Sequence, residues 1–366
     1  MIHFIHLIKI LNIKDKTTMK TKRVTIISIL FLTLCSLSGC SPNTNSISKS
    51  GFYFDTIITI TLYGTNDSTY IDHCFELAKD YENKFSNTIT TSDISKINDA
   101  AGKSAVTVND ETIELLSAGI KYGELSNGCF DLTIGYLSDL WNFSENANHS
   151  EKTNHMMDAS ILPPAKEIGE CIKHIDYTKL QIKDNSVYLD DIKSKIDIGG
   201  IAKGYIADQM KEYLNHQGIT SGIINLGGNI LTIGEKTDGS NYTIGIEKPF
   251  DKNRDAIATV KVKDKSVVTS GIYERYYKVQ DTLYHHILDV NTGYPYDNRL
   301  YSVTIISDSS MDGDALSTTC FALGLEEGLN LIEHLENTEA IFITSDYEIH
   351  KSSGIGKTIP FEQIRK

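Results

Sequence analysis

Asp314 and Thr318 are the residues whose types and spacing most directly suggest chemistry. They stand four apart in MDGDALSTTCFALG, residues 311–324, so on a helix their oxygens lie on one face. A carboxylate and a hydroxyl together suit a hard cation such as Mg²⁺, which usually keeps water and substrate phosphate as its other ligands. A capping Asp followed by a Thr bonded back to its own helix would give the same letters, so the pair alone leaves both interpretations open.

A second cluster, KIDIGGIAKGY at residues 195–205, has the features of an anion site. An apolar strand end carrying Asp197 leads into Gly199 and Gly200, and then into a helix that carries Lys203. Paired glycines at a helix start let a ligand approach the backbone, and the free N–H groups there favour an anion such as a pyrophosphate. The spacing is neither a G-x-G-x-x-G nor a P-loop. The alternative is a tight strand-to-helix turn with Asp197 as its cap.

Two further stretches supply a candidate base and candidate aromatic contacts. His285 and His286 are neighbours, so on a strand they face opposite sides and at most one points into a given cavity. A histidine beside a phosphate or hydroxyl can act as a general base, whereas a lone inward histidine is more often structural. In SNGCFDLTIGYLSDLWNF, residues 126–143, Phe130 and Trp141 either stack on an aromatic ligand or belong to the core.

Strands outnumber helices in the pattern that must position these residues. Helical spacing and boundary residues predict helices over residues 70–85, 111–125 and 201–216, and another from near Asp314 to a stop at Gly324. Strand signals fall at residues 52–62, 180–189, 222–233, 242–247, 256–262, 283–290, 301–306 and 340–344. Because strands and helices do not alternate one for one, we expect an α+β fold of mixed or antiparallel sheets with packed helices. The candidate site residues run through most of the chain, which favours one elaborated domain although 366 residues would suffice for two.

Composition excludes several classes of protein. A chain with 40% hydrophobic and 23% charged residues is ordinary for a globular protein, and it is not collagen-like, disordered or a polytopic membrane protein. Residues 1–40 hold six of the 35 basic and one of the 48 acidic residues, so the rest holds 29 and 47, a net charge of −18. So acidic a body repels nucleic acid, and we expect no nucleic-acid partner.

The segment MKTKRVTIISILFLTLCSLSGC, which begins at Met19, resembles a bacterial lipoprotein signal. A positive start precedes a short apolar stretch, and small residues lead to Cys40. We therefore predict a mis-assigned upstream extension at 1–18, a signal peptide at 19–39, lipidation of Cys40, a tether at 40–50 and the domain at 51–366. The expected location is the extracytoplasmic face of the cell membrane, with the lipid as the only membrane contact. An uncleaved anchor with a coincidental cysteine is the alternative.

The four remaining cysteines show no metal-site spacing. Cys74, Cys129, Cys171 and Cys320 are far apart and form no C-x-x-C, so neither a zinc nor a haem pattern is present. In an exported protein they allow three disulfide connectivities, and nothing in the sequence selects among them. We expect them to serve mainly as small buried apolar residues.

Taken together and in order, the motifs resemble the FAD:protein FMN transferase family, also called the ApbE-like family. The resemblance spans residues 54–324 and is carried by IDIGGIAKGY, NLGGNI, TSGIYERYY with HHILDVNTG, and SVTIISDSSMDGDALST. It implies a single ApbE-like domain behind the lipoprotein signal. The residues that match the family's functional positions are Asp314, Thr318 and the Gly200 carbonyl for Mg²⁺, His286 as the catalytic base, and Phe54, Cys129, Phe130, Asp131, Asp197, Lys203 and Ile287 for the flavin nucleotide.

The resemblance also implies a reaction. The FMN moiety of FAD would pass to a Thr or Ser hydroxyl of an exported or membrane redox protein, with Mg²⁺ as cofactor and AMP as the leaving product. One alternative is a Mg²⁺-dependent FAD pyrophosphatase, in which water replaces the hydroxyl. A second alternative is a lipid-anchored protein that binds or stores flavin, although such a protein has no reason to place Asp314 and Thr318 beside a pyrophosphate-type turn.

Overall fold

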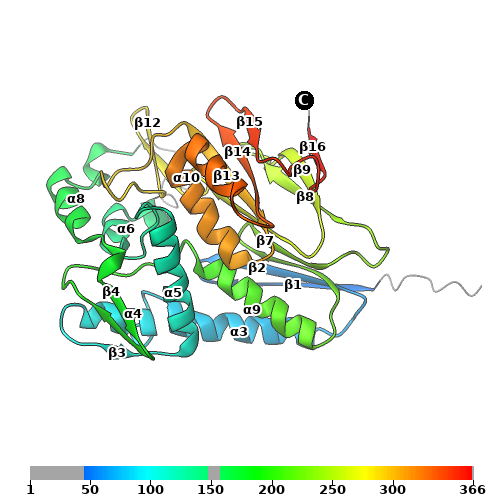
Figure 1. Cartoon of the computed structure of the whole chain (residues 1–366), viewed down its shortest axis with the longest axis horizontal. Coiled ribbons are helices and arrows are strands. Elements are labelled where there is room, and N and C mark those ends of the chain that lie inside the picture. The colour runs from blue at the N-terminus through cyan, green and yellow to red at the C-terminus, as the bar shows by residue number, and fades with distance from the viewer. Residues whose placement is uncertain (1–44, 147–156, 365–366) are drawn as a thin grey trace, which may run out of the picture. The chain divides into compact units, whose positions relative to one another are not determined.

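One large antiparallel sheet dominates the part of the chain that the computed structural model describes, residues 45–146 and 157–364 (Figure 1). Its strands lie in the order β1-β2-β6-β7-β10-β13-β14-β15. They are β1 (Ser46–Tyr53), β2 (Thr56–Tyr63), β6 (Ser221–Leu226), β7 (Asn229–Gly234), β10 (Ser266–Gly271), β13 (Leu300–Ser307), β14 (Glu339–Thr344) and β15 (Ile349–Lys351). Residues 45–366 form one unit, which agrees with the expectation of a single α+β domain.

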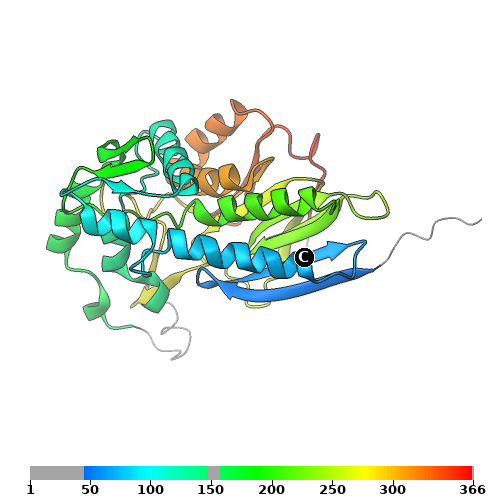
Figure 2. The same ribbon diagram turned by 90° about the horizontal axis from the view of Figure 1, so that it is seen from below.

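Helices cover one face of this sheet. In the described residues the α-helices are α3 (Thr69–Phe85), α4 (Asp93–Ala100), α5 (Asp110–Leu125), α6 (Gly135–Trp141), α8 (Ala165–Cys171), α9 (Ala202–His216) and α10 (Ser310–Glu333). Figure 2 shows α3 and α9 side by side along the hairpin of β1 and β2. The core between this sheet face and the helices includes Ile58, Ile60 and Leu62 of β2 and Ile206 and Met210 of α9.

The other face of the sheet packs on a smaller sheet. The smaller sheets are β8 (Tyr242–Glu247), β9 (Ala256–Val262) and β16 (Phe361–Gln363), then β3 (Val106–Thr107), β4 (Leu180–Lys183) and β5 (Ser186–Leu189), and the hairpin of β11 (Tyr276–Val279) and β12 (Thr282–His285). Ile230, Val267 and Ile306 of the large sheet pack on Ile244 and Val260 of β8 and β9. The large sheet is therefore buried on both faces along much of its length.

Three stretches predicted as single strands are hairpins. Residues 52–62 contain the turn between β1 and β2, residues 180–189 the turn between β4 and β5, and residues 222–233 the turn between β6 and β7. Both centres of the first turn, Phe54 and Asp55, have φ near +54°, and Gly227 and Gly228 also have positive φ. Two-residue turns of this kind interrupt a strand pattern very little, which explains why the apolar alternation alone did not locate them.

Several boundaries differ from the prediction. Strand β1 begins at Ser46, inside the stretch 40–50 that was predicted as a tether. The prediction missed this start because a polar edge strand of alternating serines lacks an apolar signal. Helix α10 begins at Ser310 rather than near Asp314, and it continues to Glu333 through a kink at Gly324, where φ is 81°. The predicted strand at 283–290 ends at His285. The extension at 1–18, the signal at 19–39 and Cys40 lie outside the described residues.

The cysteines of the described part are all free, and Cys74 and Cys320 are buried as expected. Among the helices that the structure describes, none combines the length and the apolar character that a membrane span requires.

Gly204 on α9 sets how closely α9 and α10 approach each other. A Cβ atom at this position would lie 2.1 Å from the carbonyl oxygen of Ser310 and 2.7 Å from the Cα of Met311. We expect Gly204→Ala to lower the free energy of unfolding by about 1–3 kcal/mol, because the two helix backbones would have to separate. Urea denaturation measures this value. Gly169→Ala on α8, where an added Cβ would meet nothing within 4 Å, is the matched control and should be neutral or slightly stabilising.

Candidate active site

The carboxylate of Asp314 is buried where α9 meets α10. Asp314 is 3% exposed, and its Oδ2 accepts a 3.0 Å hydrogen bond from the amide of Gly204. Lys203 Nζ lies 3.5 Å from Oδ1 and donates to the carbonyl of Gly199 at 3.1 Å. This arrangement places one anion and one cation beside the glycine turn.

Asp314 is not the cap of its helix. Ser309 caps α10, and its side-chain oxygen accepts from the amide of Asp312. Nor is Thr318 bonded back to its own helix, because its Oγ1 lies 3.1 Å from Ser270 Oγ on β10. The alternative of a capping Asp followed by a Thr bonded back to its own helix therefore does not hold. The Asp314 carboxylate and the Thr318 hydroxyl oxygen are both available to a ligand.

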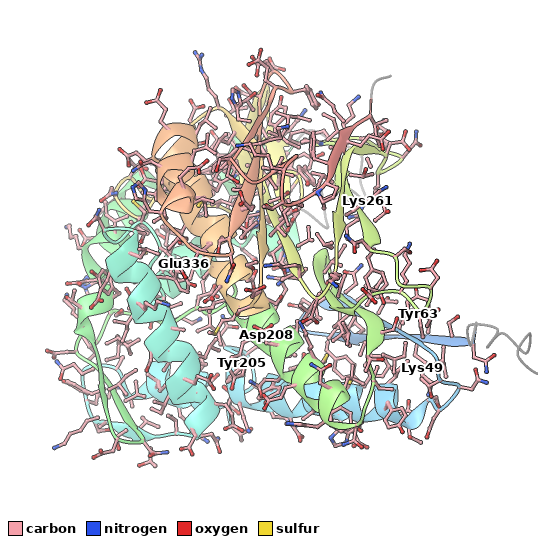
Figure 3. The ribbon with its side chains drawn as sticks, turned by 45° about the vertical axis from the view of Figure 1, so that its right-hand side comes forward. Lys49, Tyr63, Tyr205, Asp208, Lys261 and Glu336 are labelled. Carbon is pink, nitrogen blue, oxygen red and sulfur yellow. The ribbon has the colours of Figure 1, made fainter. Side chains whose placement is uncertain are left out.

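Asp208 holds the two helices together at this point (Figure 3). Its carboxylate, on α9, accepts from the Ser309 hydroxyl and from the amides of Ser310 and Met311 in the first turn of α10, at 2.8 to 2.9 Å. Burial raises the pKa of Asp208, although these three hydrogen bonds favour its charged form. The sequence patterns did not single out this residue, since a carboxylate on α9 shows no sign of capping a helix a hundred residues later.

The glycine turn brings Gly200 next to Thr318 and Phe130. A Cβ atom at Gly200 would lie 3.2 Å from the Phe130 ring and 3.7 Å from Thr318 Oγ1. The Oδ1 of Asp197 accepts from the amide of Gly199 at 2.8 Å, so Asp197 shapes the turn. It is not the cap of α9, because the N-cap position is held by Ile201. Helix α9 follows without a side-chain cap from its N-cap residue, and in its first turn the amide of Gly204 already donates to Asp314.

The SNGCFD stretch packs against the loop that follows the histidines. Phe130 is 4% exposed and packs edge-on to Tyr122. The Tyr296 hydroxyl lies beside the thiol of Cys129, whose pKa burial raises, and the amide of Tyr296 donates to the carbonyl of Ile287 at 3.1 Å. Tyr296 thus joins the segment of Cys129 and Phe130 to the segment of Ile287, and these are three of the predicted flavin contacts.

Asp131 and Phe54 are placed differently from the other predicted residues. The carboxylate of Asp131 accepts from the amide and hydroxyl of Thr133 and from the amide of Tyr177, all within 2.8 Å, so its side chain is engaged in local structure. The amide of Phe54 donates to Glu82 on α3. Phe54 lies at the same end of the large sheet as the Gly227–Gly228 turn, whose Gly227 amide donates to the carbonyl of Ile57. Their flavin-binding roles stay predictions.

His285 and His286 occupy different environments, as their alternation predicted. His285 is 4% exposed, and its Nε2 lies 3.0 Å from the carbonyl oxygen of Tyr296. His286 is half-buried. The carbonyl oxygen of Arg275 accepts a hydrogen bond from the backbone amide of His286 and lies 3.2 Å from the Nδ1 of the same histidine. Since that carbonyl only accepts, Nδ1 carries the proton and Nε2 is left with its lone pair.

His286 should remain neutral well below pH 6. Burial, together with the charge of Arg275, lowers its pKa to about 3, and Lys203 adds to this effect. In the unfolded state this histidine is protonated below about pH 6.5, whereas in the native state it stays neutral down to about pH 3. Acidification from pH 6.5 towards pH 3 should therefore destabilise the fold. An NMR titration of the imidazole resonances, assigned with His286→Gln, checks the midpoint. A midpoint near 6.5 would contradict the expected environment.

Glu274 and Asn229 were not assigned roles from the sequence. Glu274 has an exposed side chain, and the nearby charges act on its pKa in opposite directions, Asp314 raising it and Lys203 lowering it. Asn229 is 2% exposed, and neither of its amide atoms has a hydrogen-bond partner in the described structure. It follows the Gly227–Gly228 turn and shares a strand face with Leu231, which faces the helices. Only the structure shows that the side-chain amide of Asn229, in NLGGNI, is buried without hydrogen-bond partners.

The oxygens at Asp314, Thr318 and Gly200 fit a hard cation. Within the described residues, no three His, Cys, Asp or Glu side chains gather closely enough to hold a metal ion by themselves. A set of one carboxylate, one hydroxyl and one carbonyl is of a different kind, and it matches the preference of Mg²⁺ for few protein oxygens plus water and phosphate. The types of donor beside the glycine turn are thus suited to holding an anion and a hard cation.

Comparisons with known proteins agree with a site of this kind. The profile of the ApbE family matches residues 54–342. A curated FAD:protein FMN transferase of Klebsiella pneumoniae is 36% identical over 296 residues, which cover 81% of this chain and 88% of that protein. The FAD:protein FMN transferase of Treponema pallidum is 27% identical over 350 residues and covers 90% and 93%.

Solved structures show the same fold. The ApbE protein of Thermotoga maritima superposes with a TM-score of 0.74 at 31% identity, over 84% of this chain and 97% of that one. The flavin transferase ApbE of Vibrio cholerae gives 0.73 at 26% identity, over 84% and 97%. The chain belongs to the ApbE family.

Proposed function

We propose that this protein transfers the FMN moiety of FAD to a Thr or Ser hydroxyl of a second protein and releases AMP. Membership of the ApbE family and the names of the relatives support a flavin transferase. The observation that carries the proposal is the meeting of Lys203, Asp314 and Thr318 at the Gly199–Gly200 turn. A dinucleotide with a pyrophosphate bridge is the kind of ligand that such a site accommodates.

The glycine turn and Lys203 would hold the pyrophosphate bridge. The chain outside residues 1–40 carries a net charge of −18, so an anionic substrate needs local positive potential. Lys203, beside the glycine turn, provides it. Phe130, whose ring lies next to Gly200, would line the flavin half together with Cys129 and Ile287.

Mg²⁺ would be held by Asp314, Thr318 and the carbonyl of Gly200. When bound, it would neutralise phosphate charge and orient the leaving group. Lys203 is 3.5 Å from Asp314 and would shift towards the substrate phosphates when a second cation takes up the carboxylate.

His286 would take the proton from the acceptor hydroxyl. Its Nε2 carries a lone pair because Nδ1 faces the carbonyl of Arg275. The acceptor oxygen then forms a bond to the phosphorus on the riboflavin side of the bridge. The bond from that phosphorus to the bridging oxygen breaks, and AMP leaves with the electron pair.

The acceptor would be an exported or membrane redox protein with a Thr- or Ser-containing segment. We further propose that Cys40 carries a lipid and that the protein lies on the extracytoplasmic face of the cell membrane. The support is the sequence that begins at Met19, with its positive start, apolar stretch and Leu-Ser-Gly-Cys end.

Incubation of the purified protein with FAD and Mg²⁺ tests the reaction. With a candidate acceptor present, flavin fluorescence should appear on the acceptor band in a denaturing gel, and AMP should form in equal amount. Release of free FMN and AMP at the same rate without an acceptor would favour the pyrophosphatase instead. Stoichiometric FAD binding without turnover in any divalent cation would favour the flavin-binding protein.

A further inference from the structure

Three hydroxyls connect β10 to the candidate metal site. Ser270 Oγ lies 2.7 Å from Ser317 Oγ and 3.1 Å from Thr318 Oγ1. Ser317, which is fully buried, donates to the backbone carbonyl of Asp314 at 2.9 Å. The chain of contacts therefore runs from Thr318 through Ser270 and Ser317 to the backbone of Asp314.

The direction of every proton in this chain follows from its last member. The carbonyl of Asp314 has no proton to give, so Ser317 must donate its only proton there. In its contact with Ser270, Ser317 can then only accept, so the hydroxyl proton of Ser270 is donated to Ser317. Ser270 in turn can only accept from Thr318, so the Thr318 proton points at Ser270.

This order leaves the Thr318 oxygen with its lone pairs free. Those lone pairs face away from Ser270, and the position of a Cβ at Gly200 lies only 3.7 Å from Thr318 Oγ1. A helical Thr commonly donates to the carbonyl four residues earlier, here that of Asp314, but Ser317 already occupies that carbonyl. A cation at Thr318 Oγ1 would also polarise the O–H bond and strengthen the hydrogen bond to Ser270.

We propose that Ser270 is a positioning residue that receives the Thr318 proton and so fixes the Thr318 oxygen as a cation ligand. The proposal rests on the proposed function, because it presumes a divalent cation at Asp314 and Thr318. Outer-shell partners of this kind orient ligands, and their loss typically weakens metal affinity about 10- to 100-fold.

Manganese binding to the FAD-free protein tests this role directly. Mn²⁺ replaces Mg²⁺ as the probe, and electron paramagnetic resonance measures its dissociation constant in wild type and in Ser270→Ala. We expect the constant to rise about 10-fold or more in Ser270→Ala. Ser270→Thr, which keeps the hydroxyl, should restore most of the affinity. In flavin transfer, Ser270→Ala should raise the Mg²⁺ concentration for half-maximal rate and leave the rate at saturating Mg²⁺ nearly unchanged.

Thr269→Val is the matched control. Thr269 is the neighbour of Ser270 on β10, and its hydroxyl pairs with that of Thr304 at 2.8 Å on the adjacent strand. Its variant loses one strand hydroxyl of the same kind without touching Thr318, and it should bind Mn²⁺ within twofold of wild type. Equal Mn²⁺ affinities of Ser270→Ala and Thr269→Val would overturn the proposal.

Ser317→Ala keeps the test decisive if Ser270→Ala is poorly folded. Without Ser317 the Ser270 proton loses its acceptor and can turn towards Thr318, so we expect weaker Mn²⁺ binding from this variant as well. Unchanged affinity in Ser317→Ala would contradict the directional chain. If wild type and Asp314→Asn both fail to bind Mn²⁺, the metal assignment of the proposed function falls, and the role of Ser270 falls with it.

Discussion

Asp314→Asn should lower the rate of FMN transfer by about a thousandfold or more while the protein stays folded. The amide of Asn has nearly the shape of the carboxylate, and its oxygen can still accept from the amide of Gly204. What disappears is the negative charge that would hold Mg²⁺ and that now faces Lys203. In-gel flavin fluorescence of the acceptor measures the rate, and circular dichroism checks the fold.

Asp308→Asn is the control for this change. Asp308 lies just before α10 and pairs with Lys265 at 2.6 Å, but its side chain is largely exposed. Loss of such a surface pair should alter stability by less than about 1 kcal/mol and leave transfer unchanged. Covalent flavinylation at the wild-type rate in Asp314→Asn would show that no essential cation is held there.

His286→Gln should lower the transfer rate by about 10²- to 10⁴-fold, the usual range for loss of a general base. Glutamine has roughly the length of the side chain and can still donate to the carbonyl of Arg275, but it cannot take up a proton. FAD affinity, followed by quenching of flavin fluorescence, should change little because the glycine turn and Lys203 remain. The rate is measured as AMP release in the presence of the acceptor.

His350→Gln serves as the reference for the loss of an imidazole. His350 lies on β15, where its Nε2 is 3.6 Å from Glu348 near the surface. Transfer by this variant should match wild type. A full rate in His286→Gln would mean that another group removes the proton, and Glu274, whose pKa responds to the charges of Asp314 and Lys203, would be the next residue to test.

The sequence predicted the class of fold and the long helices α3, α5 and α9 well because their signals are local, but it did not predict the short helices α4, α6 and α8. Tyr70 to Phe85 and Ile201 to His216 have an apolar face with a recognisable end, and the structure has α3 and α9 within one residue of these bounds. Most strands of the large sheet were found, but β1 was not separated from β2 nor β6 from β7, since turns such as Phe54–Asp55 consist of residues that also suit strands. The strand predictions missed β10 and β15 altogether. Pairing between β2 and β6 joins residues at least 160 positions apart, and no local pattern encodes it.

In the site, as in the fold, local motifs could be predicted and contacts between distant segments could not. Asp314, Thr318, Gly200 and Lys203 were identifiable because each belongs to a compact motif, and the structure brings these motifs together. The hydrogen bonds that complete the site join distant segments through single side chains. Ser270 with Thr318 is such a pair, and residue type alone shows neither the contact nor the direction of its proton.

The three hydrogen bonds from α10 to Asp208 bear on the entropy of binding. They fix the start of α10 against α9 before any ligand arrives, so Asp314 and Lys203 need little further ordering when FAD and a cation bind. Calorimetry on the wild type should therefore give a small heat-capacity change for cation binding alone. In Asp208→Asn the same titration should show a larger unfavourable entropy, because part of the ordering of the first turn of α10 would move from folding to binding.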